Sequence, residues 1–155
     1  MSDTSRDPSA GWLEGREHFL PVRIYYEDTD FTGMVYHANY LRYFERGRSD
    51  FFRMVGIRHA ELLEQEQPTA FTIVRMEIDY RRAARVDDAL LVRTTYDEVR
   101  GPRLLVSQQI ARGDELIAEA HVQAVCIDLR GRARKPPKAM VEQLRPYLTP
   151  PKATP

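Results

Sequence analysis

Residues 25–52 read YYEDTDFTGMVYHANYLRYFERGRSDFF and carry the strongest structural signal in this chain. An acidic turn leads through Gly33 and His37 into a run of aromatic residues with helical spacing. The apolar positions of that run are Tyr40, Phe44, Gly47, Phe51 and Val55, and the polar positions opposite them are Arg42, Arg46, Ser49 and Arg53. This periodicity predicts a long helix with one buried face.

Three residues add detail to the expected helix. Asn39 is a residue type that caps helix N-termini, and Gly56 is suited to ending the helix. Gly47 lowers helix stability by its propensity, so its place in the apolar face predicts a close approach of the helix to other backbone. We therefore expect a largely enclosed helix.

Strand patterns lie on both sides of this helix. Residues 19–26 alternate before it, and four more segments follow it, at residues 70–81, 89–98, 103–111 and 116–129. Short helices are expected at residues 59–66 and from Pro136 to about residue 148. With a meander connecting the last four strands, the order predicts an α+β domain in which one antiparallel sheet of five strands wraps one long helix.

The chain has 155 residues, which suits a single domain, and we place that domain at residues 19–148. Residues 1–18 lack periodicity, and the proline-rich ending cannot continue a helix. Both residues 1–18 and residues 149–155 are therefore expected to be flexible. No internal repeat interrupts the domain.

Charge and composition exclude several classes of partner. Lys plus Arg and Asp plus Glu number 23 each, so no overall field attracts nucleic acid. No apolar run approaches the roughly 18 residues of a membrane span. Cys126 is the single cysteine and no export signal is visible, which makes the cytoplasm the expected location.

Within residues 25–52, the segments YYEDTD, Gly33, VYHANYL and FERGR follow one another in a distinctive order, and IDYRRAARVDD follows at residues 78–88. These motifs resemble the hot-dog fold acyl-CoA thioesterases of the 4-hydroxybenzoyl-CoA thioesterase type, most closely the branch associated with the Tol-Pal envelope system. The resemblance covers roughly residues 20–148. It implies the hot-dog fold, acyl-CoA as substrate, and a homodimer that pairs further into a tetramer.

The resemblance implies that Asp30 is the catalytic carboxylate, which either attacks the thioester carbonyl or activates water. Independently, the neighbouring Asp28 and partial burial beside Phe31 are expected to raise the pKa of Asp30. The alternative is structural, because Asp often caps a turn through an Asx motif.

His37 matches the active-site histidine of the same branch. Its ring is expected to position water or the carboxylate, and its backbone N–H to join an oxyanion hole, where the helix dipole favours negative charge. A histidine at a helix start that merely bonds the loop is the alternative. Gly33, Tyr36 and Asn39 are the expected substrate-binding residues around it, although a turn glycine and helix capping would also explain them.

Further substrate contacts are predicted on two other segments. Glu45 flanks the apolar face of the helix, where a second group of hot-dog thioesterases carries its carboxylate, but an interaction with Arg48 and Ser49 would explain it as well. Arg81, Arg82 and Arg85 are expected to contact the phosphates of coenzyme A, because guanidinium groups match phosphate geometry. Solvated charges at a strand end are the alternative.

Other chemistries lack their motifs. None of the five serines lies in a GxSxG elbow, and no GxxxxGK[ST] or GxGxxG signature is present. The histidines have no partners at metal-ligand spacing, so no metal site and no cofactor beyond the coenzyme A of the substrate are expected. His121 and Cys126 are interpreted as structural.

Two rival functions stay open at the level of sequence. The branch usually has small residues after the second aspartate of YYEDTD, whereas Phe31 and Thr32 stand here. Their bulk keeps open a non-hydrolytic module that binds acyl chains or acyl carrier protein in envelope or phospholipid metabolism. A hot-dog dehydratase acting on hydroxyacyl thioesters is the second rival. The length and type of the acyl chain are not determined.

Overall fold

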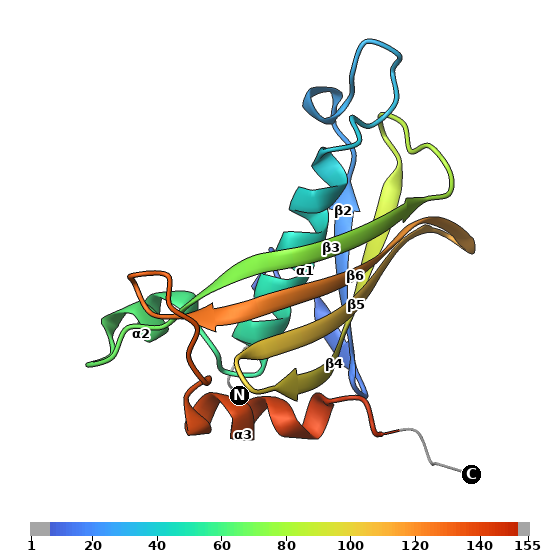
Figure 1. Cartoon of the computed structure of the whole chain (residues 1–155). Coiled ribbons are helices and arrows are strands. Elements are labelled where there is room, and N and C mark those ends of the chain that lie inside the picture. The colour runs from blue at the N-terminus through green and yellow to red at the C-terminus, as the bar shows by residue number, and fades with distance from the viewer. Residues whose placement is uncertain (1–6, 152–155) are drawn as a thin grey trace.

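The computed structural model describes residues 7–151, and the elements that it contains are labelled in Figure 1. The strands are β1 (Trp12–Glu14), β2 (Glu17–Arg23), β3 (Ala70–Tyr80), β4 (Ala89–Arg100), β5 (Arg103–Arg112) and β6 (Glu115–Ile127). The helices are α1 (Asn39–Met54), α2 (His59–Glu64) and α3 (Lys138–Leu144), with short 3-10 turns η1 (Tyr26–Asp28) and η2 (Arg145–Tyr147). The predicted α+β architecture with one long helix is confirmed.

One antiparallel sheet contains all six described strands, in the order β1-β2-β4-β5-β6-β3. The expected meander is correct for β4, β5 and β6, but β3 pairs with β6, so that Ala70 faces Ile127 and Tyr80 faces Ala118. The reason lies in residues 81–88, which pass the start of α1, where Val35 N–H donates to Ala84 O at 2.9 Å. This crossing brings β4 to β2 and leaves β3 at the sheet edge.

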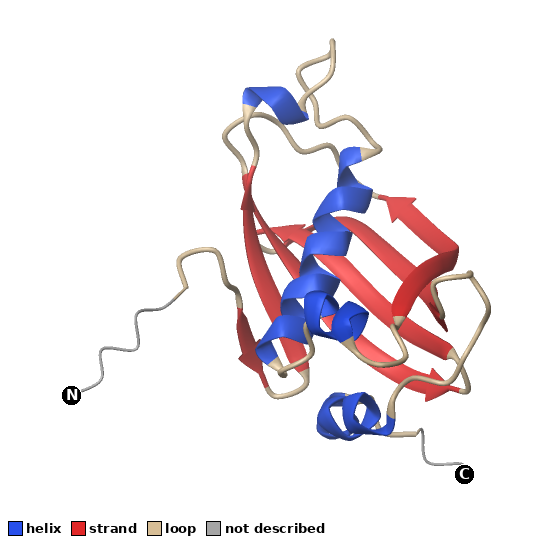
Figure 2. Ribbon diagram, turned by 90° about the vertical axis from the view of Figure 1, so that its left-hand side faces the viewer, coloured by secondary structure: helices blue, strands red, loops and turns tan. Residues whose placement is uncertain are grey.

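Helix α1 lies across one face of the sheet, as Figure 2 shows. Its aromatic side chains Tyr43, Phe44 and Phe51 are fully buried, and the small residues of β6 face the same core. A Cβ on Gly47 would lie 2.8 Å from Thr94 Oγ1 and 2.9 Å from a Val92 methyl. The predicted close approach is therefore real, but it is an approach to side chains of β4 rather than to backbone.

The N-terminal segment is more ordered than the sequence suggested. The expectation of a flexible stretch up to residue 18 is wrong for residues 12–18, because β1 pairs with β2 and β2 begins at Glu17. Asp50 of α1 fixes this region, since its Oδ2 accepts a hydrogen bond from Gly11 N–H at 2.8 Å and lies 2.6 Å from Nε2 of the buried His18. Residues 1–6 lie outside the described part of the chain.

Several further boundaries differ by a few residues from the sequence analysis, and two of them have a clear structural cause. The first predicted strand extends to Tyr26, but β2 ends at Arg23 because the chain turns into η1. At the other end, Thr149 is tied to β4, since its N–H donates to Tyr96 O at 3.1 Å and its hydroxyl donates to Asp97 Oδ1 at 2.8 Å. The flexible tail expected from residue 149 is therefore wrong at Thr149, and residues 152–155 are outside the description.

Candidate active site

The start of α1 is tied to the acidic turn through the carbonyl oxygen of Asp28. That oxygen accepts hydrogen bonds from Tyr36 N–H at 3.0 Å and from the Asn39 side-chain amide at 2.8 Å. The N-cap position of α1 is Ala38, and no side chain caps the helix there. The prediction of Asn39 as N-cap is therefore wrong, because its side chain reaches back to η1 and fixes the turn against the helix.

Asp30 is an exposed carboxylate held in an Asx-type turn. Its Oδ1 accepts hydrogen bonds from Thr32 N–H at 2.8 Å and from the Thr32 hydroxyl at 2.5 Å. The Thr32 hydroxyl, followed by the Thr32 N–H, lowers the pKa of Asp30, and His37 lowers that pKa further. The predicted increase is wrong, because Phe31 is fully exposed and provides no burial.

His37 stands at the mouth of α1 with an exposed ring. The ring lies 4.7 Å from that of Tyr36 and 6.3 Å from that of Tyr80, and the Tyr80 hydroxyl donates to His37 O at 3.1 Å. The backbone N–H of His37 donates to no acceptor among residues 7–151. A 16-residue helix thus begins beside a free donor, at the end of its dipole that favours an anion.

Tyr80 is a site residue that the sequence analysis missed. It ends β3 and contacts both His37 and Tyr40, whose ring centroid is 5.6 Å away. Its only signal in the sequence is its place within IDYRRAARVDD, which gives no indication that this strand end reaches the start of α1. The contact depends on the pairing of β3 with β6.

The remaining residues of the turn have mainly backbone roles. Gly33 has a φ of +81°, and a Cβ built on it would meet no atom within 4 Å. Its conformation rather than its lack of a side chain is what the turn requires. Tyr36 is 47% exposed, next to the His37 ring. Met34 forms a β-bridge with Arg85, which joins the turn to residues 81–88.

The three predicted phosphate-binding arginines lie in different surroundings. Arg81 forms an ion pair with Glu119 at 2.8 Å, and Arg82 lies 3.6 Å from Glu115. The guanidinium of Arg85 makes no ion pair within residues 7–151, while its backbone N–H donates to Asp88 at 2.8 Å. Within residues 7–151, Arg85 is therefore the one of the three without an ion pair, and its β-bridge with Met34 places it next to the turn.

Glu45 is not brought together with Asp30. It lies further along α1, and its Oε1 accepts a hydrogen bond from the Ser49 hydroxyl at 2.6 Å. Glu45 and Arg48 form no ion pair within 4 Å. Arg48 instead donates to Gln108 Oε1 at 2.9 Å. Glu45 thus belongs to a second polar group on the same helix.

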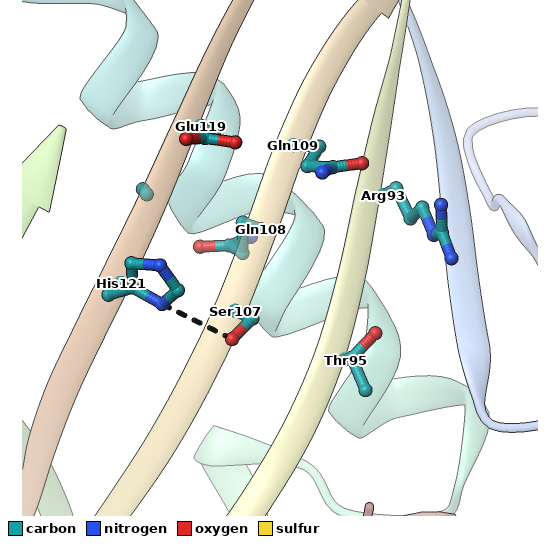
Figure 3. A pocket seen from close by; sticks show the side chains of 8 residues that line it. Arg93, Thr95, Ser107, Gln108, Gln109, Glu119 and His121 are labelled. Carbon is teal, nitrogen blue, oxygen red and sulfur yellow. Dashed lines mark hydrogen bonds between the residues drawn. The ribbon is translucent and has the colours of Figure 1, made fainter. Parts of the chain in front are cut away.

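The face of the sheet turned away from α1 also carries a polar hollow, which Figure 3 shows around Ser107 and His121. The Ser107 hydroxyl donates to Asp97 and lies 3.4 Å from His121 Nδ1. In a nucleophilic triad the histidine stands between the serine and the carboxylate, whereas here the serine stands between the other two. This group is not arranged to activate Ser107.

Metal-ligating side chains and the single thiol are two further kinds of reactive group. Residues 7–151 contain no group of three His, Cys, Asp or Glu side chains that could hold a metal ion. Cys126 is buried, and burial raises the pKa of its thiol. No helix within residues 7–151 is long and apolar enough to cross a membrane.

Comparison with known proteins gives one consistent result. A family model described as the thioesterase-like superfamily matches residues 25–144. The acyl-CoA thioesterase YbgC of Haemophilus influenzae is 44% identical over 110 residues, which are 71% of this chain and 80% of that protein. The acyl-CoA thioester hydrolase YbgC of Escherichia coli O157:H7 is 37% identical over 127 residues, which are 81% of this chain and 93% of that protein.

Solved structures agree on the fold. A probable thioesterase from Bartonella henselae superimposes with a TM-score of 0.76 at 36% identity, covering 78% of this chain and 99% of its own. A mutant 4-hydroxybenzoyl CoA thioesterase complexed with 4-hydroxybenzoyl CoA gives a TM-score of 0.78 at 22% identity, covering 83% of this chain and 99% of its own. The second likeness concerns the fold alone.

Proposed function

This chain belongs to the thioesterase-like superfamily and has its hot-dog fold, and we propose that it is an acyl-CoA thioesterase, which hydrolyses a thioester to a carboxylic acid and coenzyme A. One observation carries the assignment of the site. The turn at Asp30 holds an ionised carboxylate close to His37, whose backbone N–H at the start of α1 is free. A carboxylate beside an oxyanion donor is what thioester cleavage requires.

Asp30 supplies the attacking or activating group in this proposal. Thr32 occupies Oδ1 with two hydrogen bonds, while Oδ2 has no donor among residues 7–151. Oδ2 attacks the thioester carbonyl, expels the coenzyme A thiolate and leaves a mixed anhydride that water hydrolyses. In the alternative route Oδ2 takes a proton from water, which attacks the carbonyl directly. Both routes need the ionised form, which the lowered pKa of Asp30 favours.

His37 supports the developing oxyanion. Its backbone N–H and the N-terminal end of α1 stabilise the negative charge on the carbonyl oxygen, and one such donor is typically worth about 3 kcal/mol. Its ring lies close enough to Asp30 to influence that carboxyl group, so it orients the carboxylate or water. Arg85 is the arginine that we assign first to the phosphates of coenzyme A, with Arg81 and Arg82 further from that role because carboxylates hold them.

A homodimer completes the site in this proposal. β3 is an edge strand of 11 residues, and Ile73, Val74 and Tyr80 on it are 44%, 50% and 47% exposed. A long edge strand with exposed apolar side chains can pair with another strand, and a second copy can supply an antiparallel one.

Light scattering during size exclusion tests the assembly. We expect a dimer or a pair of dimers to carry the activity, since the exposed β3 edge exists once in each chain. A stable, fully active monomer would contradict this part of the proposal while leaving the chemistry of Asp30 open to its own test.

The motifs of residues 25–52 and 78–88 support placement in the Tol-Pal-associated branch and, with a single buried cysteine, a cytoplasmic location. The bulk of Phe31 and Thr32 kept open a non-hydrolytic binder of acyl carrier protein, and the positions of these two side chains weaken that alternative. Phe31 points into solvent, and Thr32 holds Asp30. Thr32 therefore stabilises the turn, and Phe31 fills no pocket of the same chain.

Free-thiol release from acyl-CoAs of different chain length, including an aromatic acyl group, tests the reaction. We expect release by the wild-type protein and loss of release in Asp30→Asn. Formation of an enoyl product without free thiol would indicate the dehydratase instead. Saturable binding of acyl carrier protein without turnover would indicate the binding module.

A further inference from the structure

A second cavity lies beside α1, beyond Glu45 and away from the turn. Its volume is about 160 Å³, and it is open on one side between α1, α2 and the sheet. Phe52, Phe71 and Ile73 are among its apolar walls, and Glu45, Arg48 and Ser49 are among its polar ones. A cavity of about 150 Å³ is large enough for a benzene molecule. This cavity is thus sized for a compact group rather than for a whole acyl chain.

Arg48 brings a largely buried positive charge to this cavity. It donates to Gln108 Oε1 at 2.9 Å, and the amide of Gln108 is fixed because its Nε2 donates to Phe44 O at 2.8 Å and to Thr94 Oγ1 at 2.9 Å. Arg48 makes no ion pair within residues 7–151, and burial lowers its pKa. A guanidinium held in this way, with unused donors, favours an acceptor atom from a ligand.

Glu45 brings the complementary acceptor. Its Oε1 is occupied by the Ser49 hydroxyl, and Ser49 Oγ lies 3.4 Å from Nε2 of His59 in α2. Its Oε2 receives no hydrogen bond from the described residues. One turn of α1 therefore presents an unused donor and an unused acceptor at an apolar cavity. A hydroxyl group matches both, because it accepts one hydrogen bond and donates another.

The cavity and the turn lie at two ends of the same seam between α1 and β3. At one end the Tyr80 hydroxyl donates to His37 O at 3.1 Å, and at the other the rings of Phe52 and Phe71 are 5.7 Å apart. Helical rise places Arg48 about 16 Å along α1 from His37. Apolar residues line the interval, since Met76 and Ile78 of β3 pack partly buried against the core. An aliphatic chain that lies along these residues would meet apolar surface.

We propose that this cavity binds the far end of the acyl group and selects an end that carries a hydroxyl. The inference rests on the proposed thioesterase function and names its substrate class: acyl thioesters long enough to span the seam and hydroxylated near their far end. A plain methyl end covers the unused Arg48 donors and Glu45 Oε2 without forming a hydrogen bond to them, although Gln108 and Ser49 keep their own contacts. A carboxylate end is attracted by Arg48 and repelled by Glu45, and unlike a hydroxyl it has no proton to donate to Glu45 Oε2.

The test compares three coenzyme A thioesters of equal chain length that end in a methyl, a hydroxyl or a carboxylate. The wild-type protein should prefer the hydroxyl over the methyl by about tenfold in kcat/KM, which corresponds to one hydrogen bond to a charged group. Glu45→Gln should raise kcat/KM for the carboxylate relative to the hydroxyl, because the repelling charge is gone. Arg48→Met, with its folding checked by thermal unfolding, should lose the hydroxyl preference.

Glu142→Gln is the matched control, because Glu142 is an exposed carboxylate on α3 that pairs with Arg145. It should leave the three ratios at the wild-type values. Equal kcat/KM for all three thioesters in the wild type, or the same ratios in Glu45→Gln and Glu142→Gln, would overturn the inference alone. Absence of hydrolysis for every thioester would overturn the proposed function, and the inference with it.

Discussion

The turns at Asp30 and Asp128 have almost the same local geometry and very different surroundings. Gly33 N–H donates to Asp30 O, and Gly131 N–H donates to Asp128 O, both at 3.0 Å. The φ angles of the two glycines are +81° and +82°. In each turn the aspartate side chain accepts a backbone N–H from two residues ahead, at 2.8 Å for Asp30 and 2.9 Å for Asp128.

The difference between the two turns lies in what stands beside them. The chain leaves the Asp30 turn through His37 into α1, which begins at Asn39 and whose N-terminal end favours negative charge. The chain leaves the Asp128 turn along an extended segment, where Ala133 bridges Ile127 and no helix begins before Lys138. The same Asx turn therefore becomes a candidate catalytic site only where the fold places a helix start next to it.

The largest expected effect is a loss of kcat on changing Asp30, which a change at Asp128 should not cause. Asp30→Asn removes the attacking or activating carboxylate, so kcat should fall by about 10²- to 10⁴-fold, as for other proton-transfer groups. Asparagine keeps the turn, because its amide oxygen still accepts the Thr32 N–H. Steady-state free-thiol release measures the change.

Asp128→Asn is the control for that experiment, since it alters the same kind of turn away from α1. Its kcat should equal the wild-type value. A similar loss in both variants would show that the effect comes from the turn geometry or from stability, and it would remove Asp30 from its catalytic role.

A smaller loss of kcat is expected for a change at His37, which follows the Asp30 turn and has no counterpart after the Asp128 turn. His37→Ala removes the ring but keeps the backbone N–H, so kcat should fall by roughly tenfold, less than for a direct proton-transfer group. The oxyanion contribution of the N–H stays in place. Turnover equal to or faster than wild type would restrict the role of His37 to its backbone.

The glycines of the two turns should respond alike in stability and differently in activity. Gly33→Ala and Gly131→Ala each force a side chain into a left-handed conformation, which costs about 1–2 kcal/mol. Urea unfolding should show similar destabilisation, because neither new Cβ meets an atom within 4 Å. Only Gly33→Ala should also lower kcat/KM, by shifting Asp30. Equal activity in both variants would contradict the link between turn and catalysis.

The smallest effect concerns pH. The Thr32 hydroxyl lowers the pKa of Asp30, so the active ionised form persists as pH falls until the lowered pKa is reached. Thr32→Val removes that hydroxyl and raises the pKa, so the acidic limb of the pH profile of kcat/KM should move to higher pH. Activity near pH 8 should change little. An unmoved limb would show that a group other than Asp30 controls it.

Sequence reasoning was most successful where the signal is local. The helical spacing of Tyr40, Phe44 and Phe51 predicted α1 and its buried face correctly. The strand β1 was not predicted, because three residues are too few to show alternation. The pairing of β3 was predicted wrongly, because alternation indicates a strand but not the strand with which it pairs. The predicted direction of the Asp30 pKa shift was wrong for a related reason. Phe31 is adjacent in sequence, but its side chain is exposed and does not bury the carboxylate.

Local sequence patterns account for the long helix, the acidic turn and the motif that indicates thioester chemistry. These depend on hydrogen bonds and periodicities between residues close together in the chain. Three features follow only from the tertiary structure: the contact of Tyr80 with His37, the exposure of the Asp30 side chain in the single chain, and the position of Arg48 at a largely apolar cavity. Those contacts depend on which strands pair and how the helix crosses them, and such long-range packing leaves no pattern in a short stretch of sequence.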